Sequence, residues 1–331
     1  MGSGVLRAIF CDQFGDPAAV LRCCDQPDPV PAPGELLVRT ATASVNPSDL
    51  LTVRGAYARA TALPFIPGFE AVGRVVAVGA DLSADWIGRR VLPLRGSGTW
   101  AELVASPAQW AVPVPYAIPD AVATQCYINP LTIDRLLTLD LPLSAGDVVI
   151  VNAAGSACGR IAAQTARALG LRMVAVVRRE DHRDELLSLG AAAVVNSGRD
   201  DLAATVAALT DGRGAAAALD AIGGAEGAAL AGLIAPGGTL ASYGLLSGSL
   251  LSPDLPAAAE RGVRVLSFWL KRWVDRCSPE DWQTAFAALM ARVGSGALTL
   301  TAAPPVPFAD VAAAMRLAEQ PGRRGKVVLA G

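Results

Sequence analysis

The apolar positions of the chain follow one pattern before residue 120 and another after it. Up to that point, short apolar runs alternate with Pro and Gly, a pattern typical of strands in an irregular sheet or barrel. The clearest of these runs are LLVRTATASV, GRVVAVG, RRVLPL and TWAELVAS. The sequence therefore predicts a β-rich unit at its amino end.

From about residue 145 to residue 245 the apolar runs alternate with helical segments. VVIVNAA (148–154) has the pattern of a buried strand, residues 155–159 that of a tight turn, and residues 160–169 that of a helix ended by Gly170. Further strands are predicted at 173–177, 192–196, 218–222 and 239–244, with a turn at 236–238. Strands that alternate with helices predict βαβ units in a parallel sheet.

The carboxyl-terminal part of the chain leaves this alternation. VRVLSFWL (263–270) predicts one more strand, and Ser278, followed by Pro and two acidic residues, predicts the start of a helix. A helix around 309–320 and a final strand in GKVVLAG follow. Because this end lacks the βαβ rhythm, we expect it to fold back onto the N-terminal domain.

The composition excludes several classes of partner. Of the 331 residues 52% are hydrophobic and 18% are charged, and the formal net charge is −2. Without a basic run, nucleic acid is not expected as a partner. No apolar run reaches the roughly 18 residues that span a bilayer, and the first residues lack the apolar stretch of a signal peptide. We therefore expect a cytoplasmic protein without a membrane partner.

Metal ligands are scarce in this sequence. It has one His, His182, and six Cys, none of them in a CxxC pair. A catalytic zinc needs several His, Cys or carboxylate ligands brought together, so a His-rich metal site is excluded. We expect the cysteines to serve mainly as small buried hydrophobes.

A turn of small residues links the strand at 148–154 to the helix that follows. Backbone N–H groups at a helix N-terminus attract a pyrophosphate, and small residues let it approach closely. A strict GxGxxG is absent, so the alternative is a plain strand–helix turn. The expected contacts with a dinucleotide are Ser156, Ala157, Cys158, Gly159 and Arg160.

The end of the next strand indicates which dinucleotide binds. A carboxylate there would bond the ribose 2′-OH of NAD, but this chain has Arg178 and Arg179. Arg pairs with a 2′-phosphate through charge-assisted hydrogen bonds, so NADPH is predicted rather than NADH. The alternative is that both side chains are solvated, because Glu180 and Asp181 follow directly.

Several short motifs together resemble one superfamily along nearly the whole chain. They are VNPSD (45–49), GAY (55–57), PFIPGFEAVGRVVAVG (64–79), GTWAE (98–102), INPLT (128–132), NAAGSACG (152–159), YG (243–244), FWLKRW (268–273) and GKVVL (325–329). In order and spacing they resemble the medium-chain dehydrogenases/reductases, and more narrowly the 2-enoyl thioester reductases and their quinone-reductase relatives.

This resemblance implies an α/β protein of two domains. A GroES-like, β-rich catalytic domain would comprise residues 1–122 and 293–331, and a Rossmann domain with a doubly wound parallel sheet would bind NADPH with residues 123–292. Zinc-dependent relatives carry Gly-His-Glu where this chain has Gly68-Phe69-Glu70. The resemblance therefore implies a reductase that works without zinc.

The resemblance also implies roles for particular residues. Tyr57 falls at the reaction centre. The residues expected around the cofactor are Asn46, Asn129, Tyr243, Gly244, Phe268, Trp269, Leu270 and Lys326, with Arg178 near its 2′-phosphate. The chain departs from the usual motifs at Gly155, where Asn is common, at Ala157 and Cys158, where Gly-Val is usual, and at Ile133 and Asp134.

Each of these roles has a structural alternative. By residue type alone Tyr57 is a surface Tyr that caps a turn, and Lys326 is an ordinary surface charge. Asn129 before Pro130 is a plain helix start. Trp269 and Trp273 either pack in the core or a dimer interface, or wall an apolar acyl pocket.

The predicted activity is reduction of an enoyl thioester carried by CoA or acyl-carrier protein. Fixed hydrogen-bond donors would stabilise the enolate, and Tyr57 would donate the proton or hold the substrate. A quinone or enone reductase shares the fold and cofactor and remains the main alternative, followed by a non-catalytic NADPH-binding protein. A homodimer is implied by the family, with VRVLSF (263–268) as the strand that pairs across subunits.

Overall fold

The computed structural model describes residues 4–57, 61–96, 98–249, 251 and 256–331. The chain divides into two compact units, Met1–Ile128 with Cys277–Gly331, and Asn129–Arg276. The first unit is therefore discontinuous. Its boundaries differ from the expected ones at 122/123 and 292/293.

The later boundary differs because helix α11 (Pro279–Gly294) packs within the first unit. Its Trp282 and Phe286 are fully buried, and both rings contact Tyr127 at centroid distances of 5.5 and 5.9 Å. The indole N–H of Trp282 donates to the backbone carbonyl of Trp110 (3.0 Å). Residues 277–292 thus supply core to the β-rich unit. The predicted cap is confirmed, because the Ser278 hydroxyl accepts from the Asp281 N–H.

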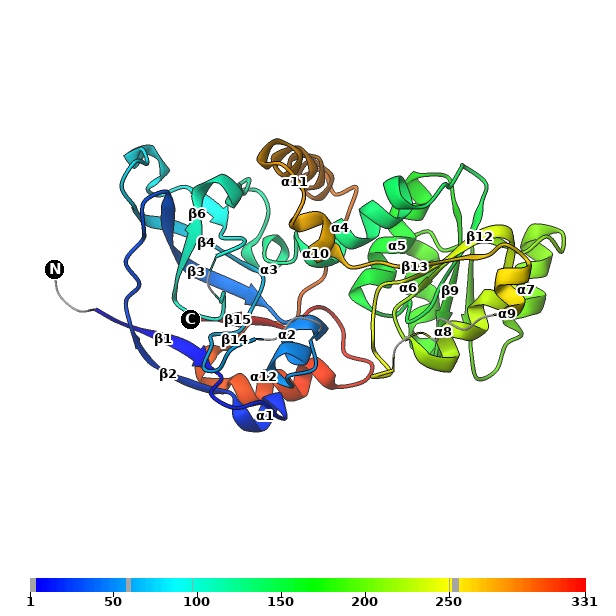
Figure 1. Ribbon diagram of the computed structural model, residues 1–331, viewed down its shortest axis with the longest axis horizontal. Helices are drawn as coiled ribbons and strands as arrows, with labels where there is room; N and C mark the ends of the chain where they lie inside the picture. The colour runs from blue at the N-terminus through cyan, green and yellow to red at the C-terminus, as the bar shows by residue number, and fades with distance from the viewer. Residues whose placement is uncertain (1–3, 58–60, 97, 250, 252–255) are drawn as a thin grey trace. The chain divides into compact units, whose positions relative to one another are not determined.

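The first unit is built on one large sheet (Figure 1). Along the sheet the strand order is β14-β15-β3-β4-β5-β7, and β6 pairs with β3. The strands are β3 (Glu35–Ser44), β4 (Ala71–Val78), β5 (Arg90–Leu92), β6 (Leu103–Pro107), β7 (Val112–Pro113), β14 (Val306–Pro307) and β15 (Val328–Ala330). A separate hairpin joins β1 (Val5–Phe10) to β2 (Arg22–Pro27).

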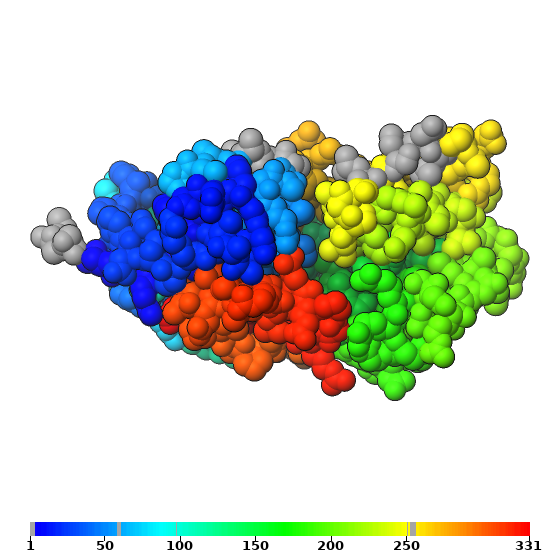
Figure 2. Space-filling model, turned by 90° about the horizontal axis from the view of Figure 1, so that it is seen from below, coloured from blue at the N-terminus to red at the C-terminus, as the bar shows by residue number. Residues whose placement is uncertain are grey.

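The end of the chain completes this unit. β15 pairs antiparallel with β3, with Val328 opposite Ser44, so the expected return of the carboxyl end to the N-terminal domain is confirmed. α12 (Val311–Glu319) packs against α1 (Pro17–Val20) and β2, and Figure 2 shows the orange-red and blue ends of the chain side by side. Two further helices belong to this unit, α2 (Pro47–Val53) and α3 (Asp120–Ala123), whereas α4 (Ile128–Arg135) lies in the second unit apart from its first residue.

The second unit is a parallel sheet with helices packed against it (Figure 1). Its strands are β8 (Val148–Val151), β9 (Arg172–Val177), β10 (Ala193–Asn196), β11 (Ala215–Asp220), β12 (Ile234–Ser242) and β13 (Arg264–Ser267). The order β10-β9-β8-β11-β12-β13 is the doubly wound arrangement, in which all strands are parallel and the strand order reverses between β8 and β11. The helices are α5 (Ala157–Ala168), α6 (Arg183–Leu189), α7 (Leu202–Thr210), α8 (Gly224–Leu230), α9 (Pro256–Glu260) and α10 (Leu270–Val274).

Two local predictions were wrong. The strand expected over 263–270 ends at Ser267, because Trp269 caps α10 and Leu270 begins it. The turn expected at 236–238 lies inside β12, where Gly237 has a positive φ of 78° and the register against β11 shifts. A bulge absorbs these residues without ending the strand.

Candidate functional site

Most predicted cofactor residues of the second unit follow the carboxyl ends of its strands. Ser242 lies opposite both Asp220 and Ser267 in register, so β11, β12 and β13 end together. Tyr243 and Phe268 are the next residues after two of these ends. In open α/β sheets ligands bind outside this edge, where the strand order reverses.

The turn after β8 has the geometry of an anion site. Ser156 is the N-cap of α5, and its hydroxyl accepts from the Gly159 N–H at 3.2 Å. A Cβ at Gly159 would lie 2.2 Å from the carbonyl oxygen of Ala154, so only glycine fits there. Helix and strand therefore approach closely, and the first N–H groups of α5 face the end of β8.

Asn129 and Cys158 are brought together in the second unit. The Cys158 thiol donates to the Asn129 side-chain oxygen at 3.4 Å. Asn129 is the second residue of α4, so it does lie at a helix start, and its side chain is buried.

The Tyr243 hydroxyl is buried and has no hydrogen-bond partner among the described residues. Burial, with a smaller contribution from Cys158, raises the pKa of Tyr243 well above its usual value. This phenol therefore stays protonated at every physiological pH. A Cβ at the neighbouring Gly244 would lie 2.5 Å from the Ala221 carbonyl oxygen, so close packing requires glycine there too.

Sequence reasoning missed the buried carboxylate of Asp220. It accepts from the side chains of Asn152 (2.6 Å) and Ser242 (2.9 Å) and from the backbone N–H groups of residues 222 and 223 (3.0 Å each). The Asn152 amide oxygen in turn accepts from the Ala221 N–H (2.8 Å). This network ties together the ends of β8, β11 and β12, and only the position of an Asp after an apolar strand could have indicated it.

The two arginines after β9 have different surroundings. Arg179 pairs with Asp181 at 2.9 Å, and that hydrogen bond lowers the pKa of the Asp181 carboxyl. Arg178 is exposed and has no ion pair or side-chain hydrogen bond within the described part of the chain. Of the two predicted phosphate ligands, one is thus available and the other is engaged.

The aromatic segment after β13 is partly placed inside the second unit. The Phe268 N–H donates to the Ser242 carbonyl (2.8 Å), which extends the pairing with β12. Leu270 is buried, whereas Phe268 and Trp269 are half-buried. The Trp273 ring stacks under the Arg135 guanidinium at 5.1 Å, which favours its packing role.

The first unit contains a buried polar network around two predicted residues. Lys326 and Asn46 are 280 residues apart, and the Lys326 ammonium donates to the Asn46 side-chain oxygen. The Asn46 amide donates to Glu70 at 2.7 Å, and the Ser44 hydroxyl also donates to Glu70. All four side chains are buried, so Lys326 is not an ordinary surface charge.

Asp49 adds a second buried carboxylate beside this network. One oxygen accepts from the Asn46 N–H (2.7 Å) in the capping box of α2, and the other has no hydrogen-bond partner among the described residues. Burial, with repulsion from Glu70, raises the pKa of Asp49 to about 7, and attraction by Lys326 opposes this.

Tyr57 follows α2 in the same unit. The chain leaves the helix through Gly55, whose φ is 68°. The half-buried Tyr57 ring lies 5.8 Å from the Phe69 ring, centroid to centroid, at an interplanar angle of 40°. The residue that the resemblance assigns to the reaction centre therefore packs on the residue that replaces a zinc ligand.

No grouping of three or more His, Cys, Asp and Glu side chains suited to a metal ion occurs in the residues that the structure describes. All six cysteines are free thiols. Cys11 and Cys126 are buried as expected, and the other four are only half-buried. Across the same residues, no helix has the length and apolar character needed to cross a bilayer.

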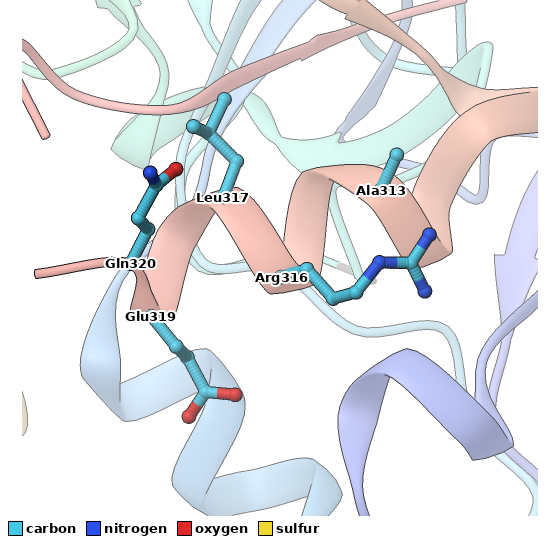
Figure 3. Close-up of a pocket in the computed structure, with 5 residues that line it drawn as sticks. All are labelled: Ala313, Arg316, Leu317, Glu319 and Gln320. Carbon is cyan, nitrogen blue, oxygen red and sulfur yellow. The ribbon is translucent and has the colours of Figure 1, made fainter.

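A surface hollow of about 540 Å³ lies along α12 (Figure 3). Ala313, Arg316, Leu317, Glu319 and Gln320 line it, and none is a predicted site residue. Glu319 is already paired with Arg54. We assign no function to this hollow.

Comparison with known families matches both units. The family described as "Alcohol dehydrogenase GroES-like domain" matches residues 32–116, and that described as "Zinc-binding dehydrogenase" matches residues 157–292. Solved structures with similar folds cover nearly the whole chain. A putative NADPH:quinone reductase from Bacillus thuringiensis has a TM-score of 0.95 at 40% identity, covering 99% of this chain and all of that one. A mycobacterial protein complexed with NADPH has a TM-score of 0.89 at 31% identity, covering 98% and 100%.

Curated relatives point to two activities. The mitochondrial enoyl-[acyl-carrier-protein] reductase of Rattus norvegicus is 30% identical over 321 residues, 96% of this chain and 86% of that protein. A probable quinone oxidoreductase of Schizosaccharomyces pombe is 32% identical over 235 residues, 71% and 70% of the two chains.

The fold and these matches define an α/β oxidoreductase with a GroES-like domain and a Rossmann-like parallel sheet, as predicted. The chain belongs to the medium-chain dehydrogenase/reductase superfamily, whose enoyl-reductase and quinone-reductase members it resembles most in sequence and structure among the matches described above.

Proposed function

We propose that the protein reduces the C=C bond of an α,β-unsaturated thioester, adding a hydride at the β-carbon and a proton at the α-carbon. The contact between Tyr57 and Phe69 carries this proposal. The phenol ring lies beside Phe69, which stands where zinc-dependent relatives carry a zinc-ligating His, and this supports a proton donor in place of a metal. The enoyl-reductase relative that aligns with 96% of the chain supports the same substrate class.

The residues of the second unit fit NADPH. Ser156 to Arg160 would hold the pyrophosphate at the start of α5, and the free guanidinium of Arg178 would pair with the 2′-phosphate. Asn129, Tyr243, Gly244 and the segment Phe268 to Leu270 would complete the site. NADPH supplies the hydride when it is bound.

The chain's own residues would supply the proton and would stabilise the enolate. The hydroxyl of a tyrosine is a hydrogen-bond and proton donor, and it can donate to the α-carbon or to the enolate oxygen. The buried network of Lys326, Asn46 and Glu70 fixes the backbone on which α2 and Tyr57 are built. No metal is required for these steps.

The test is substitution of the phenol alone. We expect Tyr57→Phe to lower the rate of NADPH oxidation with crotonyl-CoA by about 10²–10⁴-fold, the usual contribution of a general acid. NADPH affinity, measured by fluorescence titration, should stay within about twofold. Tyr116→Phe is the matched control, because Tyr116 is 74% exposed and its ring lies under the guanidinium of Arg74. Kinetics of Tyr57→Phe that equal those of the wild type would remove Tyr57 from the mechanism.

A quinone or enone reductase is the second candidate. The putative NADPH:quinone reductase at 40% identity and a TM-score of 0.95 favours it. NADPH oxidation with crotonyl-CoA and with a quinone, measured side by side, separates the two activities. Turnover of either substrate excludes the third alternative, a non-catalytic NADPH-binding protein.

A further inference from the structure

The chain's only histidine lies directly on the phosphate turn. His182 ends the short 3₁₀ helix Glu180–His182 that follows β9. A Cβ built on Gly155 would lie 2.5 Å from its Cδ2 and 2.8 Å from its Nε2, so the ring covers the bare Cα of the turn. Gly155 stands where the resembling reductases commonly have Asn. The imidazole therefore occupies space that a side chain of the turn would otherwise fill.

The ring's tautomer follows from its neighbours. A guanidinium nitrogen of Arg160 lies 3.5 Å from Nδ1, and because a guanidinium only donates, this contact favours the tautomer in which Nδ1 accepts. Arg160 is itself fixed by two hydrogen bonds to Glu185, at 2.7 and 2.8 Å. The hydrogen is thus on Nε2, which has no hydrogen-bond partner among the described residues and lies 3.8 Å from the nearest Asp181 oxygen.

The charges that face the ring keep it neutral. Burial and the positive charges of Arg160 and Arg179 lower the pKa of His182, while Asp181 and Glu185 act in the opposite direction. An uncharged imidazole with a free Nε2–H is a fixed hydrogen-bond donor that does not depend on protonation near pH 7.

The Nε2–H of His182 lies where the 2′-phosphate of NADPH would be expected. In a dinucleotide site the adenosine ribose lies between the phosphate turn and the end of the second strand. His182 contacts the phosphate turn at Gly155 and lies a few residues after the end of β9. The side chain of Arg179 is paired with Asp181. Of the two arginines that follow β9, Arg178 is the one left as a cation for a doubly charged phosphate.

We propose that His182 is a specificity-determining residue, whose Nε2–H donates to the 2′-phosphate that Arg178 pairs with. This inference rests on the proposed use of NADPH and deepens it. The phosphate site then consists of Arg178 and His182, with Arg160 holding the imidazole in place.

The experiment measures dissociation constants of the full-length protein for NADPH and NADH by fluorescence titration. His182→Phe keeps a ring over Gly155 but removes the donor, and should weaken NADPH binding about 10-fold while NADH binding stays within about twofold. His182→Gln retains an N–H donor and should recover part of the loss. Arg213→Gln is the control. Arg213 pairs with Asp211 in an exposed loop just before β11, so it lies at the amino ends of the strands and not at their carboxyl ends.

Three outcomes would overturn the inference. Equal weakening of NADPH and NADH binding in His182→Phe would show that the ring only packs against the turn. Unchanged binding in that variant, with selective loss of NADPH in Arg178→Gln, would leave Arg178 as the ligand and exclude His182. A wild-type protein that binds NADPH no more tightly than NADH would overturn the proposed cofactor as well.

A second readout uses the fact that no other histidine exists. The imidazole gives a single set of ¹H–¹⁵N signals, which should show the hydrogen on Nε2 and should shift with NADPH much more than with NADH. A signal from the Nδ1–H tautomer, or identical shifts with both dinucleotides, would contradict the proposal.

Discussion

At the scale of the residue, the protonation of the buried Asp49 carboxyl makes the stability of the fold depend on pH. Its folded pKa of about 7 lies above the unfolded value of about 3.9. Between these values the folded protein binds more protons than the unfolded chain. The free energy of unfolding therefore decreases as pH rises from about 4 to about 7.

Asp49→Asn should remove this dependence. The amide oxygen of Asn can still accept from the Asn46 N–H, and no buried charge has to form. The stability of the wild type relative to the variant should fall between pH 4 and pH 8 by at most about 4 kcal/mol, measured by urea unfolding at each pH. Asp85→Asn, on an exposed 3₁₀ turn, is the control. Parallel profiles for wild type and Asp49→Asn would contradict the prediction.

The sequence predicted which types of residue form the candidate site, but not which of them are buried or already paired with another side chain. Residue type and spacing indicated Arg178 and Arg179 equally, but only coordinates reveal that Asp181 engages the second. The resemblance named Asn46 and Lys326 separately as cofactor residues, and their pairing across 280 residues could not be predicted from any local pattern. Asp220 was missed because a buried Asp and an exposed one look identical in a sequence.

At the scale of the element, the junction of β8 and α5 is the most constrained part of the candidate site. Gly159 faces the backbone of Ala154 rather than a side chain that could move. Any Cβ there must separate the helix from the strand. The anion site and the packing of α5 are therefore set by the same residue.

Gly159→Ala should lower both stability and cofactor affinity. Overpacking against a backbone carbonyl is expected to cost about 1–3 kcal/mol of unfolding free energy, and displacement of the first turn of α5 should weaken NADPH binding by at least about 10-fold. Gly232→Ala is the matched control in the same unit, because a Cβ there meets no atom within 4 Å. If Gly159→Ala bound NADPH as tightly as Gly232→Ala, the turn would not be the phosphate site.

Elements were predicted well where apolar runs are bounded by clear turn signals. The strands β8, β9 and β10 and the cap of α11 agree with the pattern. The segment 263–270 was mistaken for one strand because Phe268 to Leu270 continue an apolar run, and the cap at Trp269 has no side-chain signature. At Gly237 the sequence predicted a turn where the strand β12 continues, because a glycine in a bulge and a glycine in a turn give the same sequence signal.

At the scale of the whole molecule, β13 is the last strand of the second sheet, and no further strand pairs with it among the described residues. β13 pairs with β12 on one side, and Val265 on this edge strand is 44% exposed. An exposed apolar edge strand is a site for pairing with another chain. The homodimer implied by the family would use this strand.

Val265→Lys should shift the protein from dimer to monomer, because a Lys on an edge strand opposes pairing between edges. Size-exclusion chromatography with light scattering should give about twice the chain mass of 33.8 kDa for the wild type and a value closer to one chain for the variant. Val30→Lys, on a residue that is 87% exposed, should remain dimeric. A dimer of unchanged strength in Val265→Lys would exclude this edge.

The return of β15 to β3 has a consequence for synthesis on the ribosome. The first unit needs residues after 277 for its core and its sheet, whereas the second unit is complete once residue 276 has emerged. Domains fold as units while the chain is made, and the amino-terminal one is normally first. Here the order is reversed: the dinucleotide unit can fold while the half that begins the polypeptide still waits for its last strand.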